Sequence, residues 1–117
     1  MHSKATSYRA GLIAEWRARW FLRFHGFRIV ASRYITGRRT GRAEIDIIAR
    51  RGNLLIFVEV KHRPNIASAW DAIGVRQSAR LRAAANTYLA RTRHRGDARF
   101  DVIIVVGRKL HWIQGAI

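Results

Sequence analysis

Two β-rich runs separated by a short turn sequence constrain the fold of this chain more than any other feature. Residues 44–49 and 54–61 are rich in isoleucine, leucine, valine and phenylalanine, and residues 50–53 between them are Arg-Arg-Gly-Asn. Runs of this kind joined by a glycine-containing turn are typical of a β-hairpin. We therefore predict a hairpin whose turn is centred near Gly52.

Apolar patterns on the N-terminal side of the hairpin indicate a helix and a strand. Residues 7–25 carry large apolar side chains at helical spacing, and Gly26 is placed to end that helix. A short β-rich run at residues 27–31 leads into a loop over residues 32–42.

A second helical region and two strands follow the hairpin. Ser68 and Asp71 form a serine-x-x-acid signature that predicts the start of a helix, and Gly74 divides the helical region. Residues 100–106 are almost continuously apolar, which is typical of a strand buried on both faces, and residues 110–113 form a last strand. The buried stripe predicted for the second main helix is Leu81, Ala85, Tyr88 and Leu89.

These elements predict a single α/β domain over residues 1–117, a usual length for one domain. The element order is α-β-β-β-α-β-β, and we expect a mixed central β-sheet flanked by helices. The chain has no cysteine, which excludes a disulfide scaffold and thiolate-bound metals. Its apolar runs are far shorter than the ~20 residues of a membrane span, so we expect a cytoplasmic protein with no membrane partner.

The net charge points to a polyanionic partner. The chain has 23 lysine and arginine residues against 7 aspartate and glutamate residues, a formal net charge of +16. All but three of the basic residues are arginines, whose guanidinium groups bind phosphate at two points and stack on bases. We expect nucleic acid, DNA in particular, although the arginine bias of a GC-rich genome also produces this composition.

Three of the seven acidic residues fall on the predicted hairpin. Alternation along a strand places Glu44 and Asp46 on one face, and Glu59 shares a face with Lys61. The turn brings Asp46 alongside Glu59, with Cβ atoms roughly 5 Å apart. Such a pair requires a raised pKa, arginine partners or a divalent cation, and an oxygen-rich cluster suits Mg²⁺ or Mn²⁺. On these residues alone, ordinary ion pairs with arginine are an equal alternative, and Glu15 is placed to add a further carboxylate.

Four segments together resemble the YraN family of small bacterial proteins. They are residues 43–49 (Ala-Glu-Ile-Asp-Ile-Ile-Ala), 57–63 (Phe-Val-Glu-Val-Lys-His-Arg), 99–102 (Arg-Phe-Asp-Val) and 111–117 (His-Trp-Ile-Gln-Gly-Ala-Ile). Each segment is a weak signal and their combination is specific. The resemblance covers nearly the whole chain, from Gly11-x-x-x-Glu15 to the C-terminus. The YraN family is similar to archaeal Holliday-junction resolvases, within the PD-(D/E)xK restriction-endonuclease-like superfamily.

The resemblance implies a restriction-endonuclease-like core and a metal-dependent nuclease. It makes Asp46 and Glu59 ligands of Mg²⁺ or Mn²⁺, with the backbone carbonyl of Val60 as a third ligand. Lys61 is the motif lysine, which orients the attacking water and offsets charge on phosphorus. Glu15 matches the helix-one acid of the resolvases and adds a further metal ligand.

One further acid matches the YraN pattern and two positions depart from it. Glu44 matches the acid of the family's Gly-Glu-Ile-Asp run and is counted with the catalytic residues. Ala43 replaces the glycine of that run. Gln77 stands where many members have lysine, and either contacts phosphate or a metal-bound water or is an ordinary surface residue.

The basic surface is expected to contact phosphates, and the aromatic residues are expected to divide between the core and external contacts. The residues expected to bind nucleic acid are Arg33, Arg38, Arg39, Arg42, Arg76, Gln77 and Arg80, with Arg17, Arg19, Arg23 and Arg82 as further phosphate contacts. The aromatic residues of the first helix, Trp16, Trp20, Phe21 and Phe24, have core spacing and are expected to pack inside. Trp70 and Trp112, nearer the element ends, are candidates for contact with nucleic acid or another subunit. Asp101 either approaches the site or forms an ion pair with Arg99 or a helix arginine, and the ion pair is favoured.

Two functions from different classes follow. The first is a metal-dependent nuclease acting on structured or branched DNA, as a homodimer if it resembles the resolvases in that respect. The second is a non-catalytic module that binds DNA or RNA and keeps the nuclease fold. The two differ in whether metal-dependent cleavage exists that loss of Asp46 and Glu59 would abolish.

Overall fold

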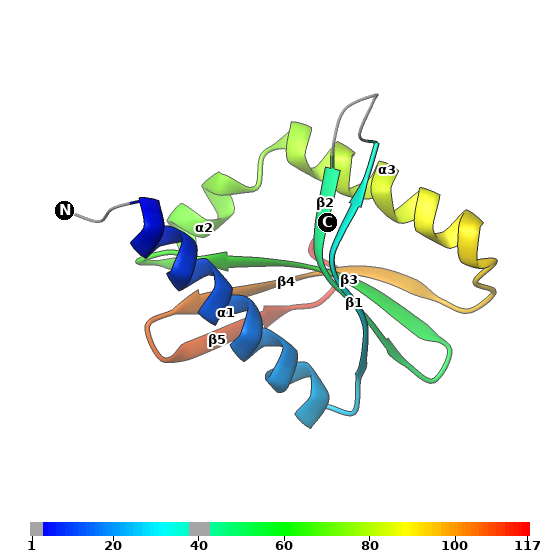
Figure 1. The fold of residues 1–117 in the computed structure, drawn as a ribbon, viewed down its shortest axis with the longest axis horizontal. Coiled ribbons are helices and arrows are strands. Elements are labelled where there is room, and N and C mark those ends of the chain that lie inside the picture. Colours follow the sequence, from blue (N-terminus) through cyan, green and yellow to red (C-terminus); the bar gives the residue numbers. More distant parts are fainter. Residues whose placement is uncertain (1–3, 38–42) are drawn as a thin grey trace.

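The computed structural model describes residues 4–37 and 43–117, and within these ranges the side chains of residues 4, 5, 75 and 76 are left aside. The elements in chain order are α1 (Lys4–Phe24), β1 (Arg28–Thr36), β2 (Ala43–Arg51), β3 (Leu54–His62), α2 (Ile66–Ala72), α3 (Val75–Thr92), β4 (Ala98–Val106) and β5 (Lys109–Ile113) (Figure 1). This order confirms the predicted succession, with the helical region divided at Gly74.

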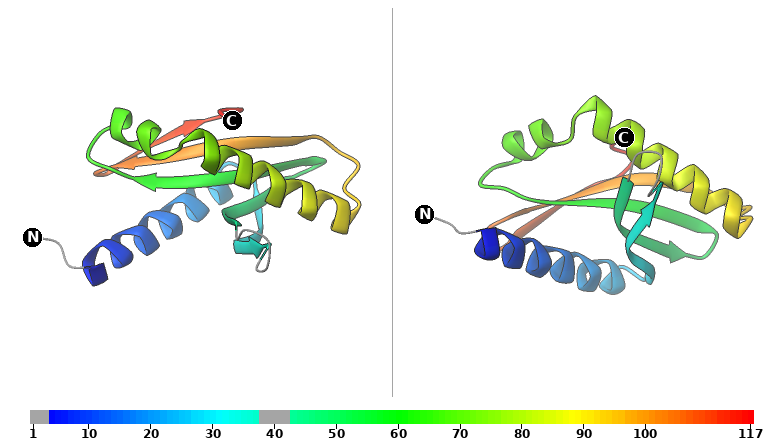
Figure 2. Two further views of the ribbon diagram at one scale, coloured as in Figure 1. Left: turned by 90° about the horizontal axis from the view of Figure 1, so that it is seen from above. Right: turned by 45° about the horizontal axis from the view of Figure 1, so that its top comes forward.

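The five strands form one sheet in the order β1-β2-β3-β4-β5. Neighbouring strands are antiparallel except β3 and β4, which are parallel, so the sheet is mixed as predicted. The β2–β3 turn lies at Gly52, whose φ of 59° is left-handed. Figure 2 shows α1 on one side of the sheet and α3 on the other.

Each face of the sheet has its own hydrophobic core. On the α1 face, Ala14, Ala18 and Leu22 pack against a cluster that includes Ile47, Val58, Ile103 and Val105. On the opposite face, Leu81, Ala84, Ala85 and Tyr88 of α3 pack against Ile45, Ile48 and Phe57. Val102 and Ile104 complete the burial of β4 on its second face, which confirms that this strand is covered on both sides.

The prediction that the aromatic residues of α1 pack inside is wrong for three of the four. Trp16, Trp20 and Phe24 are 55%, 44% and 84% exposed, and of the predicted aromatic residues Phe21 alone packs partly on the core. The buried positions are instead the small residues Ala14 and Ala18 together with Leu22. Both faces of this helix are apolar, so spacing does not distinguish them, and small side chains allow the helix to lie close to the sheet.

Two further local expectations differ from the structure. Asn65, not Ser68, caps α2: its side-chain oxygen accepts a hydrogen bond of 2.8 Å from the Ser68 backbone N–H. Strand β1 extends to Thr36, well into the predicted loop, because its ladder with β2 continues to the pair Thr36 and Ala43. The extra length brings Arg33 into the sheet.

Strand β2 changes direction at Asp46. Ile45 packs with the α3 cluster, whereas Ile47, two residues later, packs with the α1 cluster. Because residues two apart in a regular strand share a face, β2 must twist sharply between them. The β2–β3 ladder ends at the pair Ile47 and Val58, while β2 continues beside β1 to Ala43. The two strands therefore separate at Asp46.

Among the described residues, no helix is long and apolar enough to cross a membrane.

Candidate functional site

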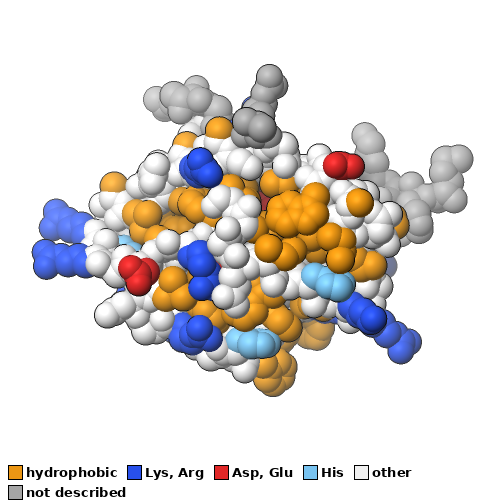
Figure 3. All heavy atoms as spheres, turned by 180° about the vertical axis from the view of Figure 1, so that it is seen from behind, with side chains coloured by type: hydrophobic (Ala, Val, Ile, Leu, Met, Phe, Trp, Pro, Cys, Tyr) orange, Lys and Arg blue, Asp and Glu red, His pale blue; other side chains and the backbone are white. Residues whose placement is uncertain are grey.

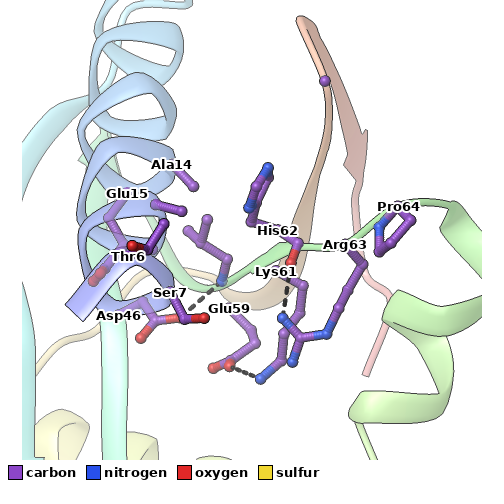
Figure 4. Close-up of a pocket in the computed structure, with 14 residues that line it drawn as sticks. Thr6, Ser7, Ala14, Glu15, Asp46, Glu59, Lys61, His62, Arg63 and Pro64 are labelled. Atoms are coloured by element: carbon purple, nitrogen blue, oxygen red, sulfur yellow. Dashed lines mark hydrogen bonds and ion pairs between the residues drawn. The ribbon is translucent and has the colours of Figure 1, made fainter. Parts of the chain in front are cut away.

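The separation of β2 from β3 leaves a cavity of about 590 Å³ between these strands and α1 (Figure 4). Helix α1 lines the cavity with small residues, including Ser7, Gly11 and Ala14, whose side chains do not fill it. Glu15, Asp46, Glu59 and Lys61 all line this space. The structure thus brings together four polar side chains from three separate elements.

A hydrogen bond and an ion pair connect the polar residues of the hairpin. The backbone N–H of Val60 donates a hydrogen bond of 2.8 Å to Oδ2 of Asp46, directly across the two strands. Lys61 Nζ lies 3.0 Å from Oε1 of Glu59, which confirms that these two side chains share a face. The other oxygen, Oε2 of Glu59, is buried and has no hydrogen-bond partner among the described residues.

Burial and mutual repulsion shift the protonation of both hairpin acids. Burial, followed by the negative charge of Glu59, raises the pKa of Asp46 to about 8, against the opposing effect of the Val60 N–H. Burial also raises the pKa of Glu59, and the neighbouring Lys61 opposes that rise. A cation placed between these carboxylates would lower both pKa values and release protons on binding.

Glu15 reaches the cavity from α1 as an ion pair with Arg33. Arg33 donates from Nη2 to Oε2 at 2.8 Å and from Nε to Oε1 at 3.3 Å, and Glu15 is only 8% exposed. The hydrogen bond to this carboxylate raises the pKa of the Arg33 guanidinium, which therefore stays charged. Arg33 also lies over the ring of Tyr8, 5.6 Å from its centroid. This arginine, expected to contact nucleic acid from a loop, holds an acid of the site instead.

Glu44 lines a different cavity from the other three acids. It lines a smaller cavity of about 240 Å³ together with Gln77, Arg80 and Leu81, and it is not among the residues that line the larger one. Its charge still raises the pKa of Glu59. Glu44 is therefore an electrostatic neighbour of the carboxylate site.

The remaining predicted phosphate contacts have different surroundings. Arg38, Arg39 and Arg42 lie outside the described residues, as does the side chain of Arg76. Arg17 donates to the backbone carbonyls of Gly107 and Arg108 at 2.8 and 2.6 Å, so it ties α1 to the β4–β5 turn.

Asp101 confirms the expected ion pair and lies outside the cavity. It is fully buried and accepts hydrogen bonds of 2.7 and 2.9 Å from Arg99. Trp112 donates its indole N–H to the same carboxylate at 2.9 Å, and the Gly115 backbone N–H donates at 3.0 Å. Trp112 also stacks edge-on against Phe21, so it serves the packing of α1 and β5 rather than an external contact.

The donor set of the cavity fits a hard divalent cation. Glu15, Asp46 and Glu59 offer carboxylate oxygens, the ligand type of Mg²⁺ and Mn²⁺, and the unpartnered Oε2 of Glu59 is a buried acceptor that such an ion would satisfy. In residues 4–37 and 43–117, no three acidic or histidine side chains are yet close enough together to hold one ion. Two of the carboxylates are engaged by Arg33 and Lys61, so ion binding requires one of them to change partner.

Comparison with known proteins places the chain in a family. The sequence profile described as Uncharacterised protein family UPF0102 matches residues 14–105. The UPF0102 protein of Agrobacterium fabrum is 43% identical over 110 residues, which cover 91% of this chain and 87% of the relative. That of Mesorhizobium japonicum is 42% identical over 106 residues, covering 89% and 82% of the two chains. The chain therefore belongs to the UPF0102 family, of which YraN is another name.

Sequence reasoning found the three carboxylates and the lysine of the cavity, and it missed the lining residues Thr6 and Ser7 and the way in which Glu15 is held. Nothing in the local pattern around Arg33 separates a loop arginine from a strand arginine facing α1. The position of Arg33 depends on tertiary structure. Strand β1 must continue far enough for Arg33 to reach α1, which precedes it in the chain.

Proposed function

We propose that this protein is a metal-dependent nuclease with a restriction-endonuclease-like core, acting on structured or branched DNA in the manner of a Holliday-junction resolvase. The observation that carries the proposal is the convergence of Glu15, Asp46, Glu59 and Lys61 on one cavity. The buried carboxylates of Asp46 and Glu59 repel each other unless a proton or a cation compensates them, and the net charge of +16 attracts a polyanionic substrate.

The residues take distinct roles in this proposal. Asp46 and Glu59 hold Mg²⁺ or Mn²⁺, with the Val60 carbonyl and Glu15 as further ligands. The bound ion supplies Lewis-acid polarisation of the scissile phosphate and a lowered pKa of a bound water. Lys61 lies 3.0 Å from Glu59, where its positive charge orients the water and stabilises charge developing on the phosphate.

A paired measurement of metal binding and cleavage tests the proposal. Mn²⁺ is titrated calorimetrically into the wild-type protein and into an Asp46→Asn, Glu59→Gln double variant, and both are incubated with a labelled four-way DNA junction. We expect binding and cleavage in the wild-type protein alone. Asp71→Asn, an exposed acid on α2, is the matched control and keeps both properties. Absence of metal binding, even with DNA present, would contradict the proposal.

A specific observation favours the second candidate, a non-catalytic module that binds DNA or RNA. Two of the three carboxylates already have basic partners, Arg33 for Glu15 and Lys61 for Glu59. If these ion pairs persist in the working protein, the carboxylates stabilise the fold and bind no metal. In that case, the double variant binds nucleic acid as the wild-type protein does, and no cleavage exists to lose.

The resolvase form of the proposal carries a further requirement. A four-way junction has two equivalent cleavage points, so a symmetric dimer is the expected assembly. Sedimentation of the protein with junction DNA measures this directly. A strictly monomeric complex would exclude the resolvase form and leave a simpler nuclease.

A further inference from the structure

The outward side of α1 carries a row of large apolar side chains that nothing in the described part of the chain covers. We call this row the α1 outer face, and it consists of Tyr8, Leu12, Ile13, Trp16, Trp20 and Phe24. The least exposed member, Leu12, is 37% exposed and the most exposed, Phe24, is 84% exposed. A helix that is apolar on both sides normally has a partner on each.

Helix geometry places this row directly opposite the core. Residues four apart follow one another along a helix with a rise of about 6 Å and a small rotation, so positions 8, 12, 16, 20 and 24 form one slanted stripe. Ala14, Ala18 and Leu22 form the equivalent stripe that packs on the sheet. The α1 outer face is therefore a continuous surface about 24 Å long from Tyr8 to Phe24.

The charges on this surface have one sign. Arg9, Arg19 and Arg23 alternate with the aromatic residues, and the one acid of α1, Glu15, is buried against Arg33. The Arg23 guanidinium lies 4.8 Å from the centroid of the Trp20 ring, so a positive group and an indole form one unit of the surface. A ligand that covers this face must be anionic and must offer flat apolar groups.

A second copy of the chain meets these demands poorly. Packing α1 against α1 brings Arg9, Arg19 and Arg23 of the two copies together without an acid on either helix to pair with them. Juxtaposed like charges oppose such an interface. Charge thus favours an anionic ligand over self-association.

Unpaired nucleotides fit the surface best. Single-stranded nucleic acid is bound by aromatic side chains that stack on its bases and by basic side chains that track its phosphates. Trp16, Trp20 and Phe24 follow one another about 6 Å apart along the axis, and the ring centroids of Trp20 and Phe24 are 6.1 Å apart. That spacing exceeds the ~3.4 Å between stacked bases in a duplex strand, so it suits bases that are separated from one another.

The outer face also leads toward the carboxylate site. Tyr8, its first member, contacts Arg33, and Arg33 binds Glu15 at the edge of the cavity. A strand lying along α1 would thus end beside the proposed cleavage centre.

Figure 3 shows the opposite side of the molecule, where hydrophobic side chains also gather. Ile66, on the separate helix α2, is an apolar residue that is 40% exposed. It does not belong to the α1 outer face and serves as the control for an exposed apolar residue.

We propose that the α1 outer face binds unpaired nucleotides of the substrate by stacking their bases on Trp16 and Trp20, while Arg19 and Arg23 contact the phosphates. This inference rests on nucleic acid being the ligand, as both candidate functions require, and it specifies that the ligand contains a single-stranded segment.

Binding is measured without metal, so that the test is independent of cleavage. The Asp46→Asn, Glu59→Gln protein in EDTA is titrated with a labelled oligothymidylate of about 20 nucleotides and with a duplex of equal length. The same titrations follow in this background with Trp16→Ala and Trp20→Ala together, and separately with Ile66→Ala. Thermal unfolding of each protein confirms that the exposed substitutions leave the fold intact.

The tryptophan pair is expected to contribute to single-strand binding specifically. Its loss should weaken oligothymidylate binding about tenfold or more and duplex binding by less than about threefold, whereas Ile66→Ala should change neither. Oligothymidylate should also quench the tryptophan fluorescence of the protein that retains Trp16 and Trp20, and the quenching should be lost with the pair.

Three outcomes overturn the inference. Equal affinity for oligothymidylate with and without the tryptophan pair excludes stacking on this face. A concentration-dependent dimer in sedimentation that the paired substitution dissociates assigns the face to a second copy. Binding to anionic phospholipid vesicles that needs the pair, with unchanged oligothymidylate binding, assigns it to a membrane surface. A failure of metal-dependent cleavage leaves these results untouched, since no metal is present.

Discussion

Arg33 binds both carboxylate oxygens of Glu15 from a backbone conformation with φ of 53°. A left-handed conformation is uncommon for a residue with a Cβ and costs of order 1 kcal/mol or more. Surrounding structure must therefore hold Arg33 in place, and the ladder between β1 and β2 does so on both sides of it. The ion pair fixes Glu15 at the cavity and neutralises it.

Removal of Arg33 should have opposite effects on stability and on metal affinity. Arg33→Ala leaves the nearly buried Glu15 unpaired, so we expect a loss of about 1 to 3 kcal/mol in the free energy of unfolding without metal. The same change frees Glu15 for an ion and should strengthen Mn²⁺ binding several-fold. Denaturant unfolding and calorimetry measure the two effects. Arg28→Ala, an exposed arginine on the same strand, should alter neither, and weaker Mn²⁺ binding by Arg33→Ala would show that Arg33 supports the metal site.

Gly96 should not tolerate a methyl group. A Cβ added there would overlap the backbone carbonyl of Asn53 in the β2–β3 turn, which cannot move without disturbing the hairpin. We expect Gly96→Ala to lower the free energy of unfolding by roughly 1 to 3 kcal/mol. Gly11→Ala is the control because its Cβ would meet no atom within 4 Å and it lies inside α1, so it should stabilise by about 0.5 to 1 kcal/mol. Chemical denaturation of both variants distinguishes these results, and equal stability of the two would contradict the predicted overlap.

The hairpin was predictable because its turn fixes its register. Once the turn is placed at Gly52, strand alternation puts Glu59 and Lys61 on one face and Asp46 beside them. Local chemistry suffices for such neighbours, since fewer than twenty residues separate them in the chain.

The face of α1 and the environment of Arg33 were not predictable in this way. Trp16 and Ala18 both lie on apolar stripes, and which stripe is buried depends on how closely the helix approaches a sheet formed by later residues. Ser32 and Arg33 are polar, so their segment resembles a loop, and only pairing with β2 makes it a strand. Both errors concern tertiary contacts that override a local pattern.

Asp101 should be essential for stability and dispensable for metal binding. Its buried carboxylate accepts hydrogen bonds from Arg99, Trp112 and Gly115, and the variant Asp101→Asn leaves the Arg99 guanidinium without its charge partner. We expect a loss of about 2 to 4 kcal/mol in the free energy of unfolding. Below the lowered melting temperature, Mn²⁺ affinity should equal that of the wild-type protein. Asp97→Asn, an exposed acid before β4, is the control for stability, and a loss of Mn²⁺ binding by folded Asp101→Asn would place Asp101 in the metal site.

The raised pKa of Asp46 should make the metal-free protein less stable as pH rises. The unfolded carboxyl loses its proton near the ordinary aspartate pKa of 3.8, whereas burial in the folded state raises this pKa to about 8. Between these values the folded state binds more protons, so the free energy of unfolding falls with increasing pH. Asp46→Asn removes this titration and can still accept the Val60 hydrogen bond, so it should stabilise the metal-free protein at pH 8 by about 1 to 3 kcal/mol and have little effect near pH 4.

Thermal unfolding of wild type and Asp46→Asn across this pH range, in EDTA and then in Mn²⁺, measures the effect. The difference between the two curves reports the titration of Asp46 together with the change that its loss causes in the neighbouring Glu59. Added Mn²⁺ should restore the stability of the wild-type protein at pH 8 and leave the variant nearly unchanged, because the ion replaces the proton on the Asp46 carboxylate. A difference between wild type and variant that does not depend on pH would show that Asp46 is ionised throughout and that its charge is already compensated within the fold.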